Sequence, residues 1–586
     1  MSSRAPRRYI FRSSWRHLPA RPHARQVPVI PHTRTSRTSA ATRGRQLWRT
    51  TSMNRKTWVL PSVIGLLAPV LAGCGGLTGS DAKEKPIVVG TSDVFAVSKD
   101  IPAPLDPAYS YDIASWNLLR QTVEPLMRIP RGGGAPTPEA AQECSFTDTG
   151  QQRYVCKLRS GLKFSNGNPI TAKTFKYSIE RVIRINAASG VKALLTNIDT
   201  IETPSDREIV FMLKTPDATF PYKLSTPTAA AVDPTLYPKN KLRSGFVVDG
   251  SGPYTVKLET EENTLVNAVF TRNTKYKGSI EVKNDRIDLR PYKDGKGLGA
   301  AVADGQIDMV VKGLTTKESD EWLANPPDHV GVTELPALEI RYLAFDTDDP
   351  LVTKPVRQAM AHVIDRGQIA SKVYGTSAEP LYSLVPQGVA GHSNSFFNAY
   401  GEPSVSKARE ALTDAGVTIP VKLTLNYATD HYGARTKGEF EVLKKQLNDS
   451  KLFDVDIKGR PWVVHKPEEQ KGKYEVYGMG WFPDFPDPDS FIAPFLDKPN
   501  FLNSPYDNKR IRKELLPESR RATDRLSTTN GSLQKIQDLV ADDVPFLPLW
   551  QGKQYVAARD DITGVEWSLS ASSILQLWEL DRGVGG

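Results

Sequence analysis

The sequence predicts an α/β fold divided into two or more lobes, and three observations carry this prediction. Short apolar runs typical of buried strands alternate with amphipathic helical patterns between residues 344 and 477. The 513 residues from position 74 to position 586 exceed what one hydrophobic core normally holds. Residues 480–491 interrupt the alternation with three prolines, and proline fixes φ and lacks an N–H donor, so this stretch predicts a stiff loop.

The first 52 residues have a composition that cannot form a hydrophobic core. They contain twelve Arg, from Arg4 to Arg49, no Lys and no acidic residue, and they are rich in Pro, Ser and Thr. An arginine-rich arm could bind nucleic acid, but the residues that follow favour another interpretation. We expect residues 1–52 to be a disordered or wrongly assigned extension, with Met53 as the true start. An unusually long basic region ahead of a signal sequence is the alternative.

Residues 53–73 have the order of charge and hydrophobicity of a secretory signal peptide. A basic pair, Arg55 and Lys56, precedes an apolar run that is too short to remain in a membrane as a spanning helix. The run ends in Leu-Ala-Gly followed by Cys74, an order that resembles the bacterial lipobox. The resemblance implies that Cys74 becomes the lipid-modified first residue of an extracytoplasmic protein on the outer face of the cell membrane. Residues 74–85 are then a flexible tether.

The charge of the chain is concentrated in the segments that we expect to be removed. The whole chain has 76 Lys and Arg against 66 Asp and Glu, a formal net charge of +10. Residues 1–52 contribute +12, and residues 74–586 retain 62 basic and 66 acidic side chains, a net charge of −4. The basic pI therefore does not indicate a nucleic-acid partner.

The three cysteines each have an expected role. Cys74 takes the lipid, whereas Cys144 and Cys156 flank a polar turn with strand-like sequence on both sides. Across such a hairpin, in an exported protein, Cys144 and Cys156 can form a disulfide; two buried free thiols are the alternative. The five His of residues 74–586 are scattered without a metal-binding spacing, so no metal site and no cofactor is expected.

The pattern of apolar, turn and capping residues predicts the following elements in order. Residues 86–91 form a buried strand, and an amphipathic helix near 115–128 ends at a Pro/Gly-rich loop. Thr171 is the N-cap of a helix that runs to about residue 184, after a strand and an Asn-Gly turn. The remaining elements are strands near 198–202 and 208–213, a helix that begins at 354–357 and has an apolar face up to residue 364, a strand at 421–427 and a helix around 439–447.

The loop at 480–491 is the first candidate for a binding site. Its sequence, Gly-Trp-Phe-Pro-Asp-Phe-Pro-Asp-Pro-Asp-Ser-Phe, contains four aromatic rings and three carboxylates. A rigid loop with aromatic walls and acidic groups can hold a cationic group by charge and by ring-face attraction. The alternative is a connector whose rings fill a core and whose Asp residues cap neighbouring backbone.

Several stretches resemble the patterns of the bacterial extracellular solute-binding proteins of family 5, the dipeptide- and oligopeptide-binding class. The first runs from Leu158-Arg159 through Asn166-Gly167 to Thr171-Ala172. The others follow in the family's order at residues 250–256, 272–276, 342–347, 356–366, 480–488 and 544–550. Each pattern alone is weak, but together they cover most of the chain.

The resemblance implies a fold similar to the type II periplasmic binding proteins, in which two lobes close over a cleft and the first lobe carries an extra subdomain. The expected segments are lobe I at 86–121, 248–339 and 546–586, an inserted subdomain at 122–247, and lobe II at 340–545. The resemblance also implies capture of a peptide and its delivery to an ABC permease with ATPase subunits. We therefore expect a monomeric binding subunit.

The resemblance also implies site residues. The family's peptide binders pair the ligand α-amine with an Asp three residues after the loop tryptophan, which is Asp484 here, while Trp481 would line a side-chain pocket. Asp487 and Asp489 are expected to be turn and cap residues.

The expected residues for the opposite end of the ligand depart from the family pattern. Dipeptide binders carry an Arg for the ligand carboxylate after the strand at 421–427. This chain has His431 or Tyr432 there. Arg435 is close by and could substitute for that Arg, or it could be solvated on the following helix. Tyr109 and Tyr111 lie in the segment that borders the pocket in relatives; surface or packing tyrosines are the alternative.

No catalytic signature stands out, so an enzyme is not expected. The sequence has no Gly-x-Ser-x-Gly elbow, no P-loop Lys and no Gly-x-Gly-x-x-Gly after a strand. Other classes stay open: a sensor of peptide signals without import, a binder of nickel chelates, sugars or cationic metabolites, and a membrane-anchored hydrolase.

Overall fold

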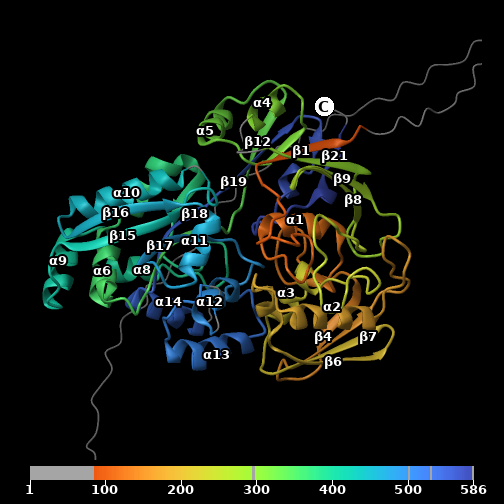
Figure 1. Cartoon of the computed structure of the whole chain (residues 1–586), viewed down its shortest axis with the longest axis horizontal. Helices are drawn as coiled ribbons and strands as arrows, with labels where there is room; N and C mark the ends of the chain where they lie inside the picture. Colours follow the sequence, from red (N-terminus) through yellow and green to blue (C-terminus); the bar gives the residue numbers. More distant parts are fainter. Residues whose placement is uncertain are drawn as a thin grey trace, which may run out of the picture. The chain divides into compact units, whose positions relative to one another are not determined.

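The computed structural model describes residues 85–292, 297–433, 435–498, 500, 502–527 and 531–583 (Figure 1). The expected extension at 1–52, the signal peptide at 53–73 and the lipidation site Cys74 lie outside these ranges, as does all of the tether except Lys85. Within the described ranges, every helix is too short or too polar to cross a bilayer.

The first lobe is built on a seven-stranded mixed sheet with the strand order β12-β19-β11-β1-β10-β9-β8. Strand β1 is central and pairs in parallel with β10 and β11, while the other neighbours pair antiparallel. All five residues of β1 are buried, which explains its continuous apolar sequence. The strands are β1 (Ile87–Thr91), β8 (Tyr254–Glu261), β9 (Thr264–Arg272), β10 (Arg286–Pro291), β11 (Met309–Lys312), β12 (Val330–Leu335) and β19 (Gln554–Arg559).

The second lobe is built on a six-stranded sheet with the strand order β14-β18-β13-β17-β15-β16. Strand β17 is central, antiparallel to β13 and parallel to β15. The strands are β13 (Ile340–Phe345), β14 (Ala378–Pro380), β15 (Val421–Ala428), β16 (Phe453–Arg460), β17 (Val476–Trp481) and β18 (Phe546–Gly552).

Two short connections join the sheets. The chain passes from β12 to β13 through residues 336–339, and from β18 to β19 through Lys553 alone. The first crossing agrees with the expected boundary at 339/340. The second differs from the expected boundary at 545/546, because β18 pairs with β13 and β14 and therefore belongs to the six-stranded sheet. An apolar run such as 546–550 does not specify which sheet it joins.

An antiparallel sheet in the order β4-β5-β7-β6 forms the core of the expected inserted subdomain. Its strands are β4 (Ala141–Phe146), β5 (Arg153–Leu158), β6 (Ile198–Ser205) and β7 (Glu208–Leu213). Cys144 and Cys156 occupy opposite positions of the β4–β5 hairpin and are joined by a disulfide. Two small pairs, β2 (Met127–Arg128) with β3 (Thr137–Pro138) and β20 (Ile562–Thr563) with β21 (Asp581–Arg582), complete the strands of the described ranges.

The helices pack on the sheets of their own lobes. In the first lobe and its subdomain, α1 packs on β8, α2 on β6 and β7, α4 on β11 and β19, and α5 on β12. In the second lobe, α10 covers β15 and β16, α6 packs on α9, and α14 packs on α6 and α8 (Figure 1). The helices are α1 (Ile113–Thr122), α2 (Ala172–Ile185), α3 (Phe220–Lys223), α4 (Leu298–Ala303), α5 (Thr316–Ala324), α6 (Lys354–Val363), α7 (Arg366–Ile369), α8 (Ser395–Tyr400), α9 (Val405–Asp414), α10 (Thr436–Asp449), α11 (Trp462–Glu469), α12 (Asp489–Leu496), α13 (Leu516–Arg521) and α14 (Gly531–Asp543).

The predicted elements are present, with two differences at their ends. Thr171 is the N-cap of α2, as predicted, and its capping box uses Thr174. Helix α1 ends at Thr122, six residues earlier than expected, because Pro125 cannot continue the helix and residues 250–252 pack against its end. The expected stiff loop at 480–491 is shorter, since Gly480 and Trp481 complete β17 and α12 starts at Asp489.

The end of α1 is held by a close approach of two backbones. The N–H of Gly252 donates to the carbonyl oxygen of Thr122 at 2.9 Å. A Cβ at Gly250 would lie 2.0 Å from that same oxygen, and a Cβ at Gly252 would lie 2.6 Å from the carbonyl carbon. Only glycine fits at these positions.

We predict that Gly250→Ala lowers the free energy of unfolding by about 1–3 kcal/mol, because the new methyl group must displace backbone rather than a flexible side chain. Gly331→Ala is the matched control, since a Cβ there meets nothing within 4 Å. Urea unfolding measures both variants. Equal midpoints for the two would contradict the close packing of residue 250 on α1.

Candidate ligand-binding site

The loop at 482–488 connects the central strand β17 to α12 and is fixed from behind by two ion pairs. The carboxylate of Asp487 pairs with Arg525 at 2.6 Å, and that of Asp489 pairs with Arg520 at 2.9 Å. The N–H of Asp489 also donates to the Asp487 carboxylate at 2.8 Å. Both Asp residues are buried. Asp487 therefore stabilises the turn as predicted, whereas Asp489 lies in the first turn of α12 and its carboxylate binds Arg520 instead of capping the helix. Asp484 is the remaining carboxylate of the loop.

Asp484 reaches across to the first lobe. Its side chain is only 9% exposed, and its Oδ2 accepts a hydrogen bond from the hydroxyl of Tyr111 at 3.1 Å. The backbone N–H of Asp484 donates to the hydroxyl of Ser490 at 3.0 Å, which fixes the turn. Burial raises the pKa of Asp484 to about 7, although the Tyr111 hydrogen bond and the positive charge of Arg120 both lower it. A cationic group of a ligand would therefore favour the ionised form of Asp484, which burial disfavours.

Trp481 points into the second lobe in this structure. Its side chain is buried, its Nε1 donates to the carbonyl oxygen of Ser490 at 2.7 Å, and its ring meets Phe495 edge-on at 5.4 Å between centroids. Its contact with a ligand stays a prediction. A Cβ at the preceding Gly480 would lie 1.6 Å from Nη1 of Arg341, so a larger residue there would displace that guanidinium.

Two aromatic side chains of the loop contact the first lobe and its subdomain. The ring of Phe485 packs against Tyr222 at 5.6 Å, and the ring of Phe482 lies 5.9 Å from the ammonium of Lys312 on β11. The loop of the second lobe thus touches the first lobe at three places: Tyr111, Tyr222 and Lys312.

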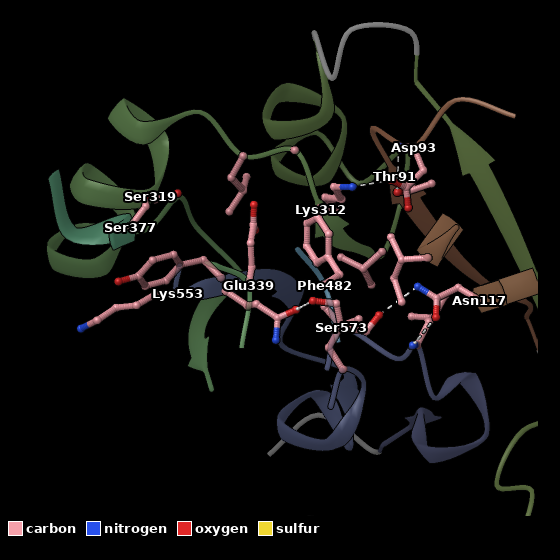
Figure 2. A pocket seen from close by; sticks show the side chains of 18 of the residues that line it. Thr91, Asp93, Asn117, Lys312, Ser319, Glu339, Ser377, Phe482, Lys553 and Ser573 are labelled. Carbon is pink, nitrogen blue, oxygen red and sulfur yellow. Dashed lines mark hydrogen bonds and ion pairs between the residues drawn. The ribbon is translucent and has the colours of Figure 1, made fainter. Parts of the chain in front are cut away.

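A cavity of about 230 Å³ lies beside the two connections that join the sheets (Figure 2). Its walls come from both lobes and from both connections between them. The first lobe contributes Thr91, Asp93, Asn117, Lys312, Ser319 and Ser573, the second contributes Ser377, Arg435 and Phe482, and the connections contribute Glu339 and Lys553.

Most of the charged side chains that line this cavity form ion pairs with other residues of the protein. Lys312 pairs with Asp93 at 2.6 Å, and Glu339 pairs with the buried Arg341 at 2.8 Å. Lys553 bridges two carboxylates of the crossing strands, Glu334 at 3.2 Å and Glu379 at 2.8 Å.

Arg435 is the least compensated cation of this wall. Its Nη1 donates to the carbonyl oxygen of Tyr374 at 3.2 Å. Burial lowers the pKa of Arg435, and the negative charge of Asp320 offsets this only in part. Arg435 therefore presents a cation to the cavity, and its role as a carboxylate-binding residue stays a prediction.

His431 lies beside the cavity rather than in its wall. Its ring stacks parallel to that of Trp462, with 3.8 Å between centroids. Desolvation by the surrounding protein, together with the positive charges of Arg341 and Lys312, lowers the pKa of His431 to about 3, although the ring keeps contact with solvent. A neutral imidazole in this position is a poor ligand for a carboxylate.

The two predicted tyrosines, Tyr109 and Tyr111, have different surroundings. Tyr111 contacts Asp484, whereas the hydroxyl of Tyr109 donates to the backbone carbonyl of Asp100 within its own segment. Sequence reasoning missed Phe482, Lys312, Glu339 and Lys553. Phe482 could have been found from its place next to Trp481, but the other three come from segments that carry no binding motif.

A metal centre is not formed by the described side chains, since no group of three or more His, Cys, Asp or Glu residues gathers within coordinating reach.

Comparison with known proteins identifies the family. A model of the bacterial extracellular solute-binding proteins, family 5, matches residues 135–503, which is more than half of the chain. The chain belongs to this family. Its two-lobed α/β fold is also that of solved periplasmic peptide-binding proteins.

Three similar proteins, one compared by sequence and two by structure, illustrate what this chain resembles. It is 25% identical over 537 residues to the oligopeptide-binding protein OppA of Bacillus subtilis, covering 85% of this chain and 94% of the relative. The DppA binding protein of Helicobacter pylori, solved with the peptide STSA, superimposes with a TM-score of 0.72 at 20% identity, covering 85% of this chain and 98% of that one. The binding protein AgaA of Agrobacterium tumefaciens, solved with agropinic acid, gives a TM-score of 0.72 at 19% identity, covering 85% and 99%.

We predict that Asp484→Asn stabilises this family 5 protein increasingly as the pH rises. The folded-state pKa of Asp484, about 7, lies above the ordinary value of 3.8, so its contribution to stability is lost as the pH rises through 7. The full shift corresponds to at most about 4 kcal/mol. The difference in melting temperature between variant and wild type should be small at pH 4 and reach a plateau above pH 8. A pH-independent difference would show that the pKa of Asp484 is the same in the folded and unfolded states, so that burial does not raise it.

Proposed function

We propose that this protein captures peptides outside the cytoplasm and delivers them to an ABC importer. The observation that carries the proposal is the position of the cavity. It lies at the junction of the two lobes, with an acidic loop reaching across from the second lobe and cationic groups in its walls. A peptide is a zwitterion, so a site that offers carboxylates and cations on different elements is complementary to it.

Asp484 is the proposed partner of the ligand's α-amine. Its carboxyl group is buried and its pKa is raised to about 7, so an ammonium group would pair with a carboxylate that is otherwise costly to ionise. A ligand without the amine would leave this group uncompensated, a difference of a few kcal/mol. The hydrogen bond from Tyr111, two residues before α1, holds the carboxyl at the first lobe, and the neighbouring loop residue Phe482 lines the cavity.

Arg435 is the proposed partner of the ligand's terminal carboxylate. It lines the cavity and has one described hydrogen bond, to a backbone carbonyl, which leaves its other N–H groups for an anion. His431 is the weaker candidate, because its low pKa keeps it neutral. Trp481 is proposed to line a side-chain pocket from behind the loop, and Tyr109 to border it at the surface.

The cellular context of the proposal rests on the sequence. Cys74 would carry the lipid that holds the protein at the outer face of the cell membrane. The partners would be an ABC permease and its ATPase subunits, with the binding protein acting as a monomer and without enzymatic turnover. Genes for a permease and ATPases beside this one would favour import; their absence would favour a sensor of peptide signals.

A small solute other than a peptide is the second candidate. The likeness to AgaA, whose structure contains agropinic acid, has the same TM-score of 0.72 as the likeness to the peptide-bound DppA. A cavity of about 230 Å³ also suits a ligand of few residues or a compact metabolite better than a long peptide.

We predict that mass spectrometry of the purified protein will detect a co-purified short peptide with a free amino terminus. Native spectra report the mass of the bound complex, and spectra after denaturation identify the released ligand. A released sugar, opine-like acid or nickel chelate would replace the peptide assignment with the solute-binding alternative.

We predict that Asp484→Asn weakens binding of free-amine peptides by at least about tenfold, since it removes a charge-assisted contact. Binding of the matching N-acetylated peptides should change far less, because they bring no ammonium group to this position. Titration calorimetry with each peptide in both forms measures the effect. An equal loss for the two forms would assign Asp484 a structural role.

A further inference from the structure

A second, smaller cavity of about 60 Å³ lies next to the C-terminal end of α1. Most of its wall is apolar, and three charged side chains reach it. The apolar residues include Val123, Pro125, Ile129, Pro253, Ile280, Ile574 and Trp578, and the charged residues are Arg120, Arg128 and Glu139.

The second cavity borders the same elements as the first. Helix α1 contributes Asn117 to the first cavity and Arg120, one turn further on, to the second. In the segment 569–578, Ser573 and Leu575 line the first cavity while the alternate residues Ile574 and Gln576 line the second. The two cavities therefore lie on opposite sides of one shared wall.

Two of the three charges in the second cavity neutralise each other. Nε of Arg128 lies 3.3 Å from the carboxylate of Glu139. The same carboxylate accepts hydrogen bonds from the hydroxyl groups of Tyr276 and Ser279 and from the N–H of Ser279. The Glu139 carboxylate is therefore neutralised and hydrogen-bonded by residues of the protein.

Arg120 differs from this pair because no described carboxylate forms an ion pair with it. Its Nη1 is buried and has no hydrogen-bond partner among the described residues. The guanidinium lies over the ring of Trp116 at 5.0 Å, and Trp116 in turn contacts Tyr111, with 5.7 Å between the ring centroids. A half-buried guanidinium whose Nη1 is buried without an acceptor is costly, and an anion that reaches it would remove that cost.

Asp484 compensates Arg120 only in part. Burial lowers the pKa of Arg120 to about 9, and the charge of Asp484 offsets this incompletely. The hydroxyl of Tyr111 donates to the Asp484 carboxylate, and Arg120 makes no hydrogen bond to it among those of the described residues. The charges of Asp484 and Arg120 thus influence each other without a direct hydrogen bond.

We propose that the second cavity binds a carboxylate carried on a short apolar stem, and that Arg120 thereby selects ligands with an acidic group next to their amino end. The apolar walls suit one or two methylene groups, and the free N–H groups of Arg120 supply charge-assisted hydrogen bonds to the carboxylate. The inference rests on the proposed function, since it takes the ligand's amine to lie at Asp484. A peptide with an N-terminal acidic residue would meet both groups at once.

Titration calorimetry with the full chain tests the proposal with two tripeptides, Glu-Ala-Ala and Gln-Ala-Ala, which differ by one charge at nearly constant shape. Wild type should bind the Glu peptide at least about tenfold more tightly, the value expected of hydrogen bonds to a charged group. Arg120→Met should bring the two affinities to within about twofold of each other, and Arg120→Lys should retain part of the preference.

The matched control is Arg131→Met, which removes a neighbouring arginine that lies over Trp567 and does not line the cavity. It should keep the full preference for the Glu peptide. Melting temperatures check that each variant folds, and Arg120→Gln replaces Arg120→Met if the latter does not. Equal affinities in wild type, or a preference that survives in Arg120→Met, would overturn the assignment of Arg120.

A separate arm distinguishes failure of this inference from failure of the proposed function. If wild type binds neither tripeptide, peptide binding fails, and the cavity is then tested with propionate and propionamide in thermal unfolding. Stabilisation by propionate alone, lost in Arg120→Met, supports the carboxylate site for a ligand of another class. An equal response of wild type and Arg120→Met to both compounds overturns it.

Discussion

The contact of the loop at 482–488 with the first lobe is the constraint on which the binding region depends. The loop leaves the central strand of one sheet, and its Asp484 and Phe485 are buried against Tyr111 and Tyr222 of the other lobe. It can hold this position because the ion pairs of Asp487 and Asp489 fix it from behind. Proline at three positions further reduces the conformations that the loop could adopt.

The two connections between the sheets position two charged side chains of the larger cavity, Glu339 and Lys553. Glu339 ends the first crossing, and Lys553 is the whole of the second, so the backbone of each is tied to both sheets. Both side chains line the larger cavity. The groups that line the cavity are thus positioned by the fold's connectivity, and their relative positions depend on the angle between the two sheets.

The buried charges of the site are a cost to the folded state. Asp484 has a pKa raised to about 7, and Arg120 has one lowered to about 9, both because burial penalises their ionised forms. Elsewhere the fold neutralises such groups, as in the Arg181–Asp106 pair at 2.6 Å. Groups left under-compensated in a cleft are the ones that a ligand can stabilise, which is how a binding protein couples recognition to electrostatics.

The sequence by itself determined the local elements and the family, whereas only the tertiary structure decided which charges share a site. The buried run of β1, the Thr171 cap of α2 and the strand at β15 follow from periodicity and capping, which depend on neighbours within a few residues. The loop motif likewise singled out Asp484. The sheet that β18 joins, and the electrostatic influence of Arg120 on Asp484, depend on packing between segments hundreds of residues apart. Such pairings are set by the packing of whole lobes, and no local pattern records them.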